Sequence, residues 1–207
     1  MGRPRNDGGP TAPQRLEAAF FDLLSATPYQ DVTISALVRE AGVNRNSFYY
    51  HYTDLDDLAR SATDNVVLSE IAHLIASGLT PASEQVDQLF RVPGMAERVR
   101  RMLILTGSHS TARLRGIVRE AVQDIWLAEF GLEREDLEPQ EEAALDFIAG
   151  GAMALLSRVD PNITGKEGPP ELTLELIAEI RSIPVLTVGA RFLADTLQEA
   201  RARKRDE

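Results

Sequence analysis

The stretch VTISALVREAGVNRNSFYYHYTDLDDL, residues 32–58, contains two short segments with helical apolar spacing, one on each side of Gly42. In the first segment the apolar residues that share one face are Ile34, Leu37, Val38 and Ala41. Thr33 and Asn44 stand at the N-cap positions of the two segments, and glycine suits the left-handed conformation that ends a helix. Two short helices joined at a glycine turn predict a helix-turn-helix, which places its second helix in the DNA major groove.

The second of these helices has two unlike faces. A rotation of about 100° per residue puts Phe48 and Tyr52 on one face, where an aromatic pair can anchor the helix. The other face is polar and carries Arg45, Asn46, Tyr49 and Tyr50, with Ser47 and His51 at its edge. Arginine pairs with guanine and asparagine with adenine, while hydroxyl groups and histidine suit phosphate oxygens. Because this helix contains no acidic residue, we expect its polar face to contact DNA.

The pattern T-I-x-x-L-x-x-x-A-G-V-N-R-x-S-F-Y-Y-H-Y-x-x-L-D-D-L occupies residues 33–58. Together with the apolar helix before it, this pattern resembles the DNA-binding domain of TetR-family transcriptional regulators, over about residues 11–60. The resemblance implies phosphate contacts from Thr33, Ser47, Tyr49 and His51, and base contacts from Arg45 and Asn46, with Ser35 as a helper. It also implies a second helical domain that binds a small-molecule effector and forms a homodimer.

One position departs from the family pattern. Leu55 stands where the family often has a lysine, and Asp54, Asp56 and Asp57 flank it. Thr53 and Asp56 have the spacing of a capping box, which gives the acidic residues a structural reason to be there. Their negative charge would also repel DNA locally. We therefore expect modest DNA affinity with a strong dependence on salt.

Helical periodicity continues through the remaining chain and strand patterns are nearly absent, so the sequence predicts an all-α fold. A first helix is expected to begin at the capping pattern of Thr11 and Gln14, and a fourth to run from Asp54 to about Ser77. Further helices are expected at about residues 82–90, 93–108, 111–130, 139–159, 172–181 and 184–203, with a loop at 160–170.

These elements divide the chain into three parts. Residues 1–10 are expected to form a flexible arm, whose Arg3 and Arg5 either enter the minor groove or remain solvated. Residues 11–58 form the predicted helix-turn-helix domain, and residues 59–207 form a helical ligand-binding and dimerisation domain.

Two helices of the second domain are candidates for a dimer interface. The helix after Pro139 is apolar nearly all round from Ala143 to Leu156, which is typical of a helix with several neighbours. The last helix has an apolar stripe formed by Leu186, Gly189, Leu193 and Leu197. We expect these helices to form half of a four-helix homodimer interface, with a monomeric core as the alternative. A dimer that places two recognition helices about one DNA turn apart would read a palindromic operator on double-stranded DNA.

The function predicted from these features is that of a sequence-specific transcriptional regulator, a repressor that an unknown small-molecule effector releases from its operator. The residues that could line the effector pocket, or could instead belong to the core, are His73, Met102, Leu105, His109, Trp126 and Phe130.

Composition argues against several other classes. The chain has no cysteine, hence no disulfide and no thiolate metal site, which fits the reducing cytoplasm that we expect as its location. The first residues lack an apolar signal-peptide core, and the longest apolar run, Phe147–Leu156, is far shorter than the roughly 20 residues that span a membrane. The formal net charge is −10, but residues 1–60 hold six arginines and eight acidic residues and contribute only −2 of it.

An enzyme is the main alternative from another class. The histidines are His51, His73 and His109, and no His-x-x-x-His, Gly-x-Ser-x-Gly or P-loop spacing occurs. Ser108 beside His109 is more typical of a loop or helix end than of a catalytic pair. We therefore expect no catalytic residue, no metal and no cofactor. The other alternative is a ligand-binding or protein-interaction module whose weakened helix-turn-helix no longer binds DNA specifically.

Overall fold

The structure, a computed structural model, describes residues 9–67, 69–78, 83–159 and 184–206, and the regular elements within these ranges are all helices. They are α1 (Ala12–Leu24), η1 (Tyr29–Asp31), α2 (Ile34–Glu40), α3 (Arg45–His51), α4 (Leu55–Asp64), α5 (Ser69–Ala76), α6 (Glu84–Phe90), α7 (Met95–Thr106), α8 (Ala112–Phe130), η2 (Arg134–Asp136), α9 (Pro139–Leu156) and α11 (Pro184–Asp206). The predicted all-α fold is confirmed. The loop expected at 160–170 and the helix expected at 172–181 lie outside the described residues, as do residues 1–8 of the predicted arm. None of the helices in the described part is long and apolar enough to cross a bilayer.

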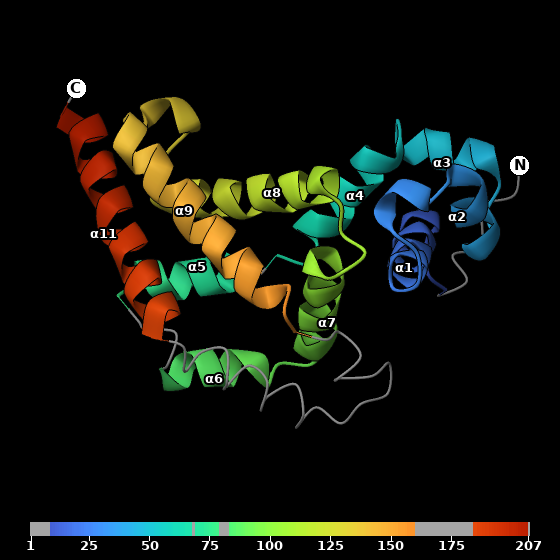
Figure 1. The fold of residues 1–207 in the computed structure, drawn as a ribbon, viewed down its shortest axis with the longest axis horizontal. Coiled ribbons are helices and arrows are strands. Elements are labelled where there is room, and N and C mark those ends of the chain that lie inside the picture. Colours follow the sequence, from blue (N-terminus) through green and yellow to red (C-terminus); the bar gives the residue numbers. More distant parts are fainter. Residues whose placement is uncertain (1–8, 68, 79–82, 160–183, 207) are drawn as a thin grey trace, which may run out of the picture.

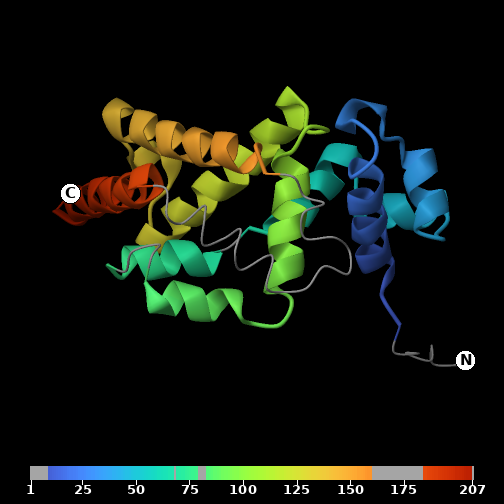
Figure 2. The ribbon, with the colours of Figure 1, turned by 60° about the horizontal axis from the view of Figure 1, so that its bottom comes forward.

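Helix α8 is the central element of the molecule. It runs between the group α1–α3 at one end and the pair α9 and α11 at the other (Figure 1). Helices α4, α5, α7, α9 and α11 all pack against it, and α5 and α6 lie side by side below it (Figure 2). One apolar cluster joins Phe20 and Phe48 of the N-terminal helices to Leu105 of α7 and Leu114 of α8. The helix-turn-helix is therefore packed directly on α7 and α8, and the domain boundary at residue 58 stays a prediction.

The start of the first helix follows the expected capping box. The backbone N–H of Gln14 donates to Thr11 Oγ1 at 3.4 Å, and the Thr11 N–H donates to Gln14 Oε1 at 2.8 Å. Leu16 and Phe20, which share the apolar face of α1, are fully buried. The sequence therefore places both the beginning and the inner face of α1 correctly.

The single fourth helix expected from Asp54 to about Ser77 is wrong, because the structure has two helices there, α4 and α5. Asn65 ends α4, and the following Val66 and Val67 turn into the core, where both are buried. The break leaves the carbonyl of Val67 available, and Arg98 Nη2 of α7 donates to it at 2.8 Å. The Ser69 N–H also donates to this carbonyl, at 3.2 Å, whereas Arg98 is 31 positions away and is a partner that helical periodicity cannot reveal.

The other end of the molecule has its own core, formed by α5, α8, α9 and α11. Leu193 and Leu197 are fully buried in it, and a Cβ on Gly189 would lie 2.9 Å from Ile148 Cδ1 of α9. The α11 stripe assigned above to the dimer interface thus packs on the chain's own α9, and that assignment is wrong for these three residues; the side chain of Leu186 lies outside the described part. The stripe was apolar because it faces a neighbour, but periodicity does not say whether that neighbour belongs to the same chain.

Candidate nucleic-acid interface

The turn between α2 and α3 is set by two side-chain caps and one glycine. The N–H of Ala36 donates to Thr33 Oγ1 at 3.2 Å, and the N–H of Ser47 donates to Asn44 Oδ1 at 2.7 Å, so both predicted N-caps are confirmed. Between them Gly42 has a φ of +61°, where any residue with a Cβ would be strained. The hydroxyl of Thr33 accepts the capping bond, and its hydrogen is therefore still able to donate to a phosphate.

Helix α3 is held by the aromatic pair that its sequence predicts. Phe48 is fully buried and Tyr52 is 7% exposed, with their ring centroids 5.8 Å apart. Both pack in the cluster that contains Leu37 of α2. Because a buried aromatic pair fixes the rotation of a seven-residue helix, the orientation of the opposite face follows from it.

The opposite face of α3 is open to solvent. Arg45, Asn46 and His51 are exposed, Tyr49 is 48% exposed, and Ser47 is half-buried at the edge. Arg45 Nη2 donates to the Tyr49 hydroxyl at 3.2 Å, and its guanidinium lies 5.6 Å from the centroid of that ring. The remaining predicted contact residues, Thr33 and Ser35, are exposed at the start of α2. The structure therefore brings all the predicted residues to α3 and the start of α2, whereas their contacts with DNA stay a prediction.

The acidic residues that follow α3 serve the start of α4. Asp54 is its N-cap, because its Oδ1 accepts the N–H of Asp57 at 2.9 Å. Asp57 Oδ2 in turn accepts the N–H of Thr53 at 2.8 Å. The capping box expected from Thr53 and Asp56 is therefore wrong. The cap residue is Asp54 and its partner is Asp57, each one position further along the chain. Leu55, which replaces the family's lysine, is half-buried against the core and cannot contact a phosphate.

Asp56 connects α4 to two distant parts of the chain. Its Oδ1 accepts the Tyr29 hydroxyl at 2.6 Å, and its Oδ2 pairs with the guanidinium of Arg113 at the start of α8. Partial burial alone would raise the pKa of Asp56, but the hydrogen bonds from Arg113 and Tyr29 outweigh it and hold the pKa below its ordinary value. For Tyr29, burial and the bond to Asp56 raise the pKa of the phenol. The carboxylate is therefore charged and the phenol neutral near pH 7, the states in which this bond is strongest.

This geometry agrees with a comparison to known families. A family model described as bacterial regulatory proteins, tetR family, matches residues 16–62, which extend from α1 into α4. Residues 16–62 therefore form a TetR-family helix-turn-helix domain. The family is one of DNA-binding transcription regulators that are generally not enzymes and are typically dimeric. The match covers 47 of the 207 residues and does not extend to the helices that follow α4.

Tyr50 is a further exposed residue on the recognition helix of this TetR-family domain. It is 84% exposed, and its ring meets that of His51 edge-on at 4.9 Å. In the sequence Tyr50 lies on the polar face of the helix, and no DNA contact was predicted for it. Its exposure, together with a hydroxyl able to donate to a phosphate, makes it a candidate equal to Tyr49.

His109 connects the α7–α8 loop to the end of α1. Its Nδ1 lies 3.0 Å from the carbonyl oxygen of Leu24, and the N–H of Tyr29 donates to the His109 carbonyl at 3.0 Å. A carbonyl only accepts, so Nδ1 must carry the hydrogen. His109 thus joins the TetR-family domain to α7 and α8. The loop position expected of Ser108 and His109 is confirmed, and His109 is not among the described lining residues of the two cavities below, so its suggested place in an effector pocket is not supported.

Two cavities lie outside the TetR-family domain. The larger, about 500 Å³, is bounded by α5, α6 and α8, and His73 is the only one of the six suggested pocket residues among its described lining. Met102, Leu105 and Phe130 are core residues, Trp126 packs against the second core, and His109 lies in the loop described above. The second cavity, about 410 Å³, lies between the α7–α8 loop and α9.

In the part of the chain that the structure describes, no group of three or more His, Cys, Asp or Glu side chains is arranged to hold a metal ion. The predicted absence of a catalytic residue and of a cofactor stays a prediction. Proteins of the TetR family are generally not enzymes, which makes an enzymatic function less expected.

Proposed function

We propose that the chain is a sequence-specific transcriptional repressor that binds a palindromic operator as a homodimer and is released by a small molecule. The observation that carries this proposal is the exposed face of α3, where Arg45, Asn46 and Tyr49 lie opposite the buried Phe48. An arginine and an asparagine side by side at the start of a recognition helix are suited to the edges of guanine and adenine. Thr33, Ser35, Ser47 and His51 would position this helix on the phosphates.

An exposed apolar surface on α9 and α11 supports the homodimer. Phe147 of α9 is 77% exposed, and Val188 and Phe192 of α11 are 67% and 56% exposed. Gly151 is exposed beside them, and a Cβ on it would meet nothing within 4 Å. Two exposed phenylalanines on adjacent helices that already pack together are typical of an interface between subunits. A second copy related by a two-fold axis would complete a four-helix arrangement from the same pair of helices. Phe147 and Gly151 belong to the α9 stretch that the sequence suggested, whereas Val188 and Phe192 replace the suggested α11 stripe.

The effector would enter the larger cavity, between α5, α6 and α8. Its volume of about 500 Å³ lies in the range of small-molecule sites. The cavity is close to the break between α4 and α5, and α4 packs against α1 of the TetR-family domain. A ligand that binds one arrangement of this break more tightly than another would shift the population of DNA-binding dimers.

Selection of bound sequences from a random pool of duplex DNA tests the proposal. A palindrome would support DNA binding, dimerisation and operator symmetry together. Arg45→Ala should lose about 1–3 kcal/mol of binding free energy on the selected site and relax the preference at one base pair of each half-site. Arg119→Ala, which removes an exposed arginine from α8, is the matched control and should bind like the parent. Enrichment of no sequence at about 50 mM salt would refute the proposal.

That negative result would favour the alternative of an interaction module without specific DNA binding. Its main support was the acidic start of α4. In the structure each of these three acids already has an intramolecular partner, and Asp56 is paired with a guanidinium. The charge that faces DNA is correspondingly weaker than the sequence alone implies.

A further inference from the structure

The described lining of the cavity between α5, α6 and α8 contains acidic but no basic Lys or Arg side chains. The lining residues that α5 and α8 contribute include the carboxylates of Glu70 and Glu129, and none of the described lining side chains is Lys or Arg. Glu129 is bonded through its Oε1 to His73 Nδ1 at 2.8 Å, which leaves its second oxygen available as an acceptor. The described lining itself supplies two carboxylates and no guanidinium or ammonium group, although Arg98 of α7 pairs with one of them, Glu70. The lining therefore favours a ligand with a positive charge over an anion.

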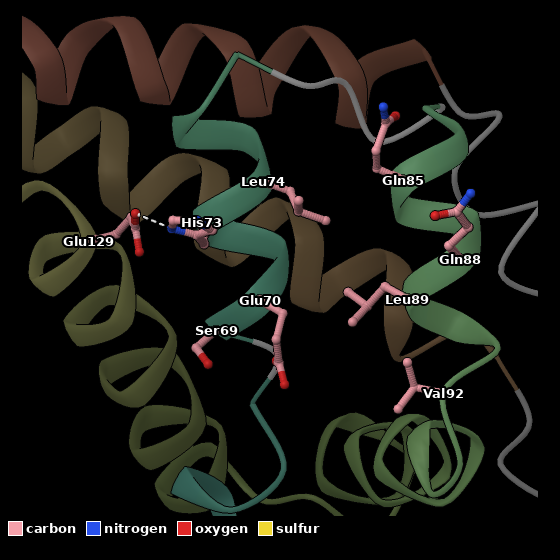
Figure 3. A pocket seen from close by; sticks show the side chains of 9 residues that line it. All are labelled: Ser69, Glu70, His73, Leu74, Gln85, Gln88, Leu89, Val92 and Glu129. Atoms are coloured by element: carbon pink, nitrogen blue, oxygen red, sulfur yellow. Dashed lines mark hydrogen bonds and ion pairs between the residues drawn. The ribbon is translucent and has the colours of Figure 1, made fainter.

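The opposite part of the cavity is apolar. Leu74 of α5 and Leu89 of α6 point into the space between the two helices, and Val92 lies just beyond them (Figure 3). Val92 is 51% exposed and adds a solvent-accessible apolar side chain to this part of the lining. Glu70 of α5 lies near these side chains, whereas Glu129 of α8 borders the cavity on the other side of α5, bonded to His73 (Figure 3). A ligand that fits this division has an apolar body and a cationic, hydrogen-bond-donating end.

Glu70 already has a cationic partner within the protein. Arg98 of α7 donates to both of its oxygens, Nη1 to Oε1 at 2.6 Å and Nη2 to Oε2 at 3.1 Å. These hydrogen bonds hold the pKa of Glu70 below its ordinary value, so the carboxylate is charged near pH 7. The same Nη2 donates to the carbonyl of Val67 at 2.8 Å, in the break between α4 and α5. Arg98 therefore binds the cavity wall and the end of the α4 segment with a single guanidinium.

We propose that this cavity binds an organic cation with an apolar body, and that the cation competes with Arg98 for Glu70, so that the contact between Arg98 and Val67 is lost when the ligand binds. This deepens the proposed function and rests on it for the step from ligand to DNA release. Ligand and guanidinium both need the Glu70 oxygens, and the second oxygen of Glu129 is a further acceptor for a cation on the cavity lining. Binding is thereby coupled to the position of the chain between α4 and α5.

Three probes of one shape test the charge preference: 4-phenylbutylamine, 4-phenyl-1-butanol and 4-phenylbutanoate. Isothermal titration calorimetry of each into the full chain without DNA measures binding to the cavity directly. We expect the amine to bind at least tenfold more tightly than the alcohol and the carboxylate. Glu129→Gln should weaken the amine about tenfold, while Asp124→Asn, which removes an exposed carboxylate of the same helix outside the cavity, should leave it unchanged. Equal binding of the three probes, or no binding of the amine at millimolar concentration, would overturn the proposal.

The competition has a signature that a merely structural Arg98 would not produce. Arg98→Met removes the competitor, so the amine should bind about tenfold more tightly although the protein has lost an ion pair. Arg91→Met removes an exposed guanidinium next to Val92 and controls for the general change in charge; it should alter the affinity less than twofold. If the two variants behave alike, Arg98 and the ligand do not compete and the proposed coupling is wrong.

Measuring DNA binding separately distinguishes the two proposals. A chain that binds the amine but selects no DNA sequence would contradict the proposed function and leave the cation site standing. A chain that selects a palindrome but does not bind the amine would contradict the cation site alone. If both hold, adding the amine should weaken operator binding in the parent, and Glu129→Gln should need about tenfold more amine for the same effect.

Discussion

Replacing Tyr29 by phenylalanine tests the contact between the TetR-family domain and α8. The ring of Tyr29 is 4% exposed and packs edge-on against Phe20, so phenylalanine preserves the packing and removes only the hydroxyl. The lost bond is the 2.6 Å hydrogen bond to Asp56. Hydrogen bonds to charged groups contribute about 1.5–3 kcal/mol. Since Asp56 keeps Arg113 and its side chain is 25% exposed, water can replace part of the bond, and we expect a loss of about 1–2 kcal/mol.

Urea unfolding at constant protein concentration measures this loss as a lower midpoint at an unchanged slope. Tyr50→Phe is the matched control, because the side chain of Tyr50 is 84% exposed. Its free energy of unfolding should stay within about 0.5 kcal/mol of the parent's.

The dependence on pH follows from the lowered pKa of Asp56. A carboxylate whose pKa is depressed in the folded state stabilises the protein above its unfolded pKa, about 3.9, and this stabilisation is lost as the pH falls through the folded pKa. The hydroxyl of Tyr29 helps to depress that pKa, so the difference between Tyr29→Phe and the parent should be full at pH 7 and shrink below about pH 4. A variant as stable as the parent at pH 7, or a difference that does not change down to pH 3, would refute the role assigned to Asp56.

Three further results are expected. Tyr49→Phe should weaken binding to all DNA sequences about equally, by roughly threefold to tenfold in a gel-shift titration, because its hydroxyl is assigned to phosphate and not to a base; a changed base preference would contradict this. Glu141→Gln should lower the free energy of unfolding by about 2–3 kcal/mol, since the carboxylate is 8% exposed and bonded by both terminal nitrogens of the guanidinium of Arg203, and a midpoint equal to the parent's would show that the pair adds nothing. Phe192→Asp should convert the proposed homodimer to monomers, measured as a halved molecular mass in sedimentation, without loss of helical circular dichroism. A homodimer whose mass is unchanged by this substitution would place the interface elsewhere.

Local patterns in the sequence predicted most of the TetR-family domain. The caps at Thr11, Thr33 and Asn44 and the turn at Gly42 depend on contacts within a few residues, and all four are present. The two faces of α3 follow from its helical repeat and are likewise as expected.

The elements that the sequence did not predict depend on distant partners. The break after α4 is compatible with helical spacing on both sides, and the Val67 carbonyl in it accepts both from the nearby Ser69 N–H and from Arg98, 31 residues away. Asp56 looked like part of a capping box, yet its partners are 27 and 57 residues away. The apolar stripe of α11 was predicted to lie at a subunit interface, but Leu193 and Leu197 are buried in the core that α11 shares with α9 of the same chain. Periodicity identifies a face that needs a neighbour, and it cannot identify the neighbour.

The break between α4 and α5 changes how a signal from the cavity can reach α3. In a single helix from Asp54 to Ser77, a shift at the cavity would move the far end as a rigid lever. Helix α4 has only ten residues, and polar contacts hold both of its ends: Asp56 to Arg113 and Tyr29 at the start, and Val67 to Arg98 just past the end. Both arginines lie on the α7–α8 side of the molecule. A ligand that takes Glu70 from Arg98 would loosen the contact just past the end of α4, while Asp56 keeps the contact at its start. Other bonds near the end of α4, from Arg60 to Glu120 and from Asn65 to Glu17, are exposed to solvent, so α4 could pivot about its start, next to the recognition helix, without unfolding any helix.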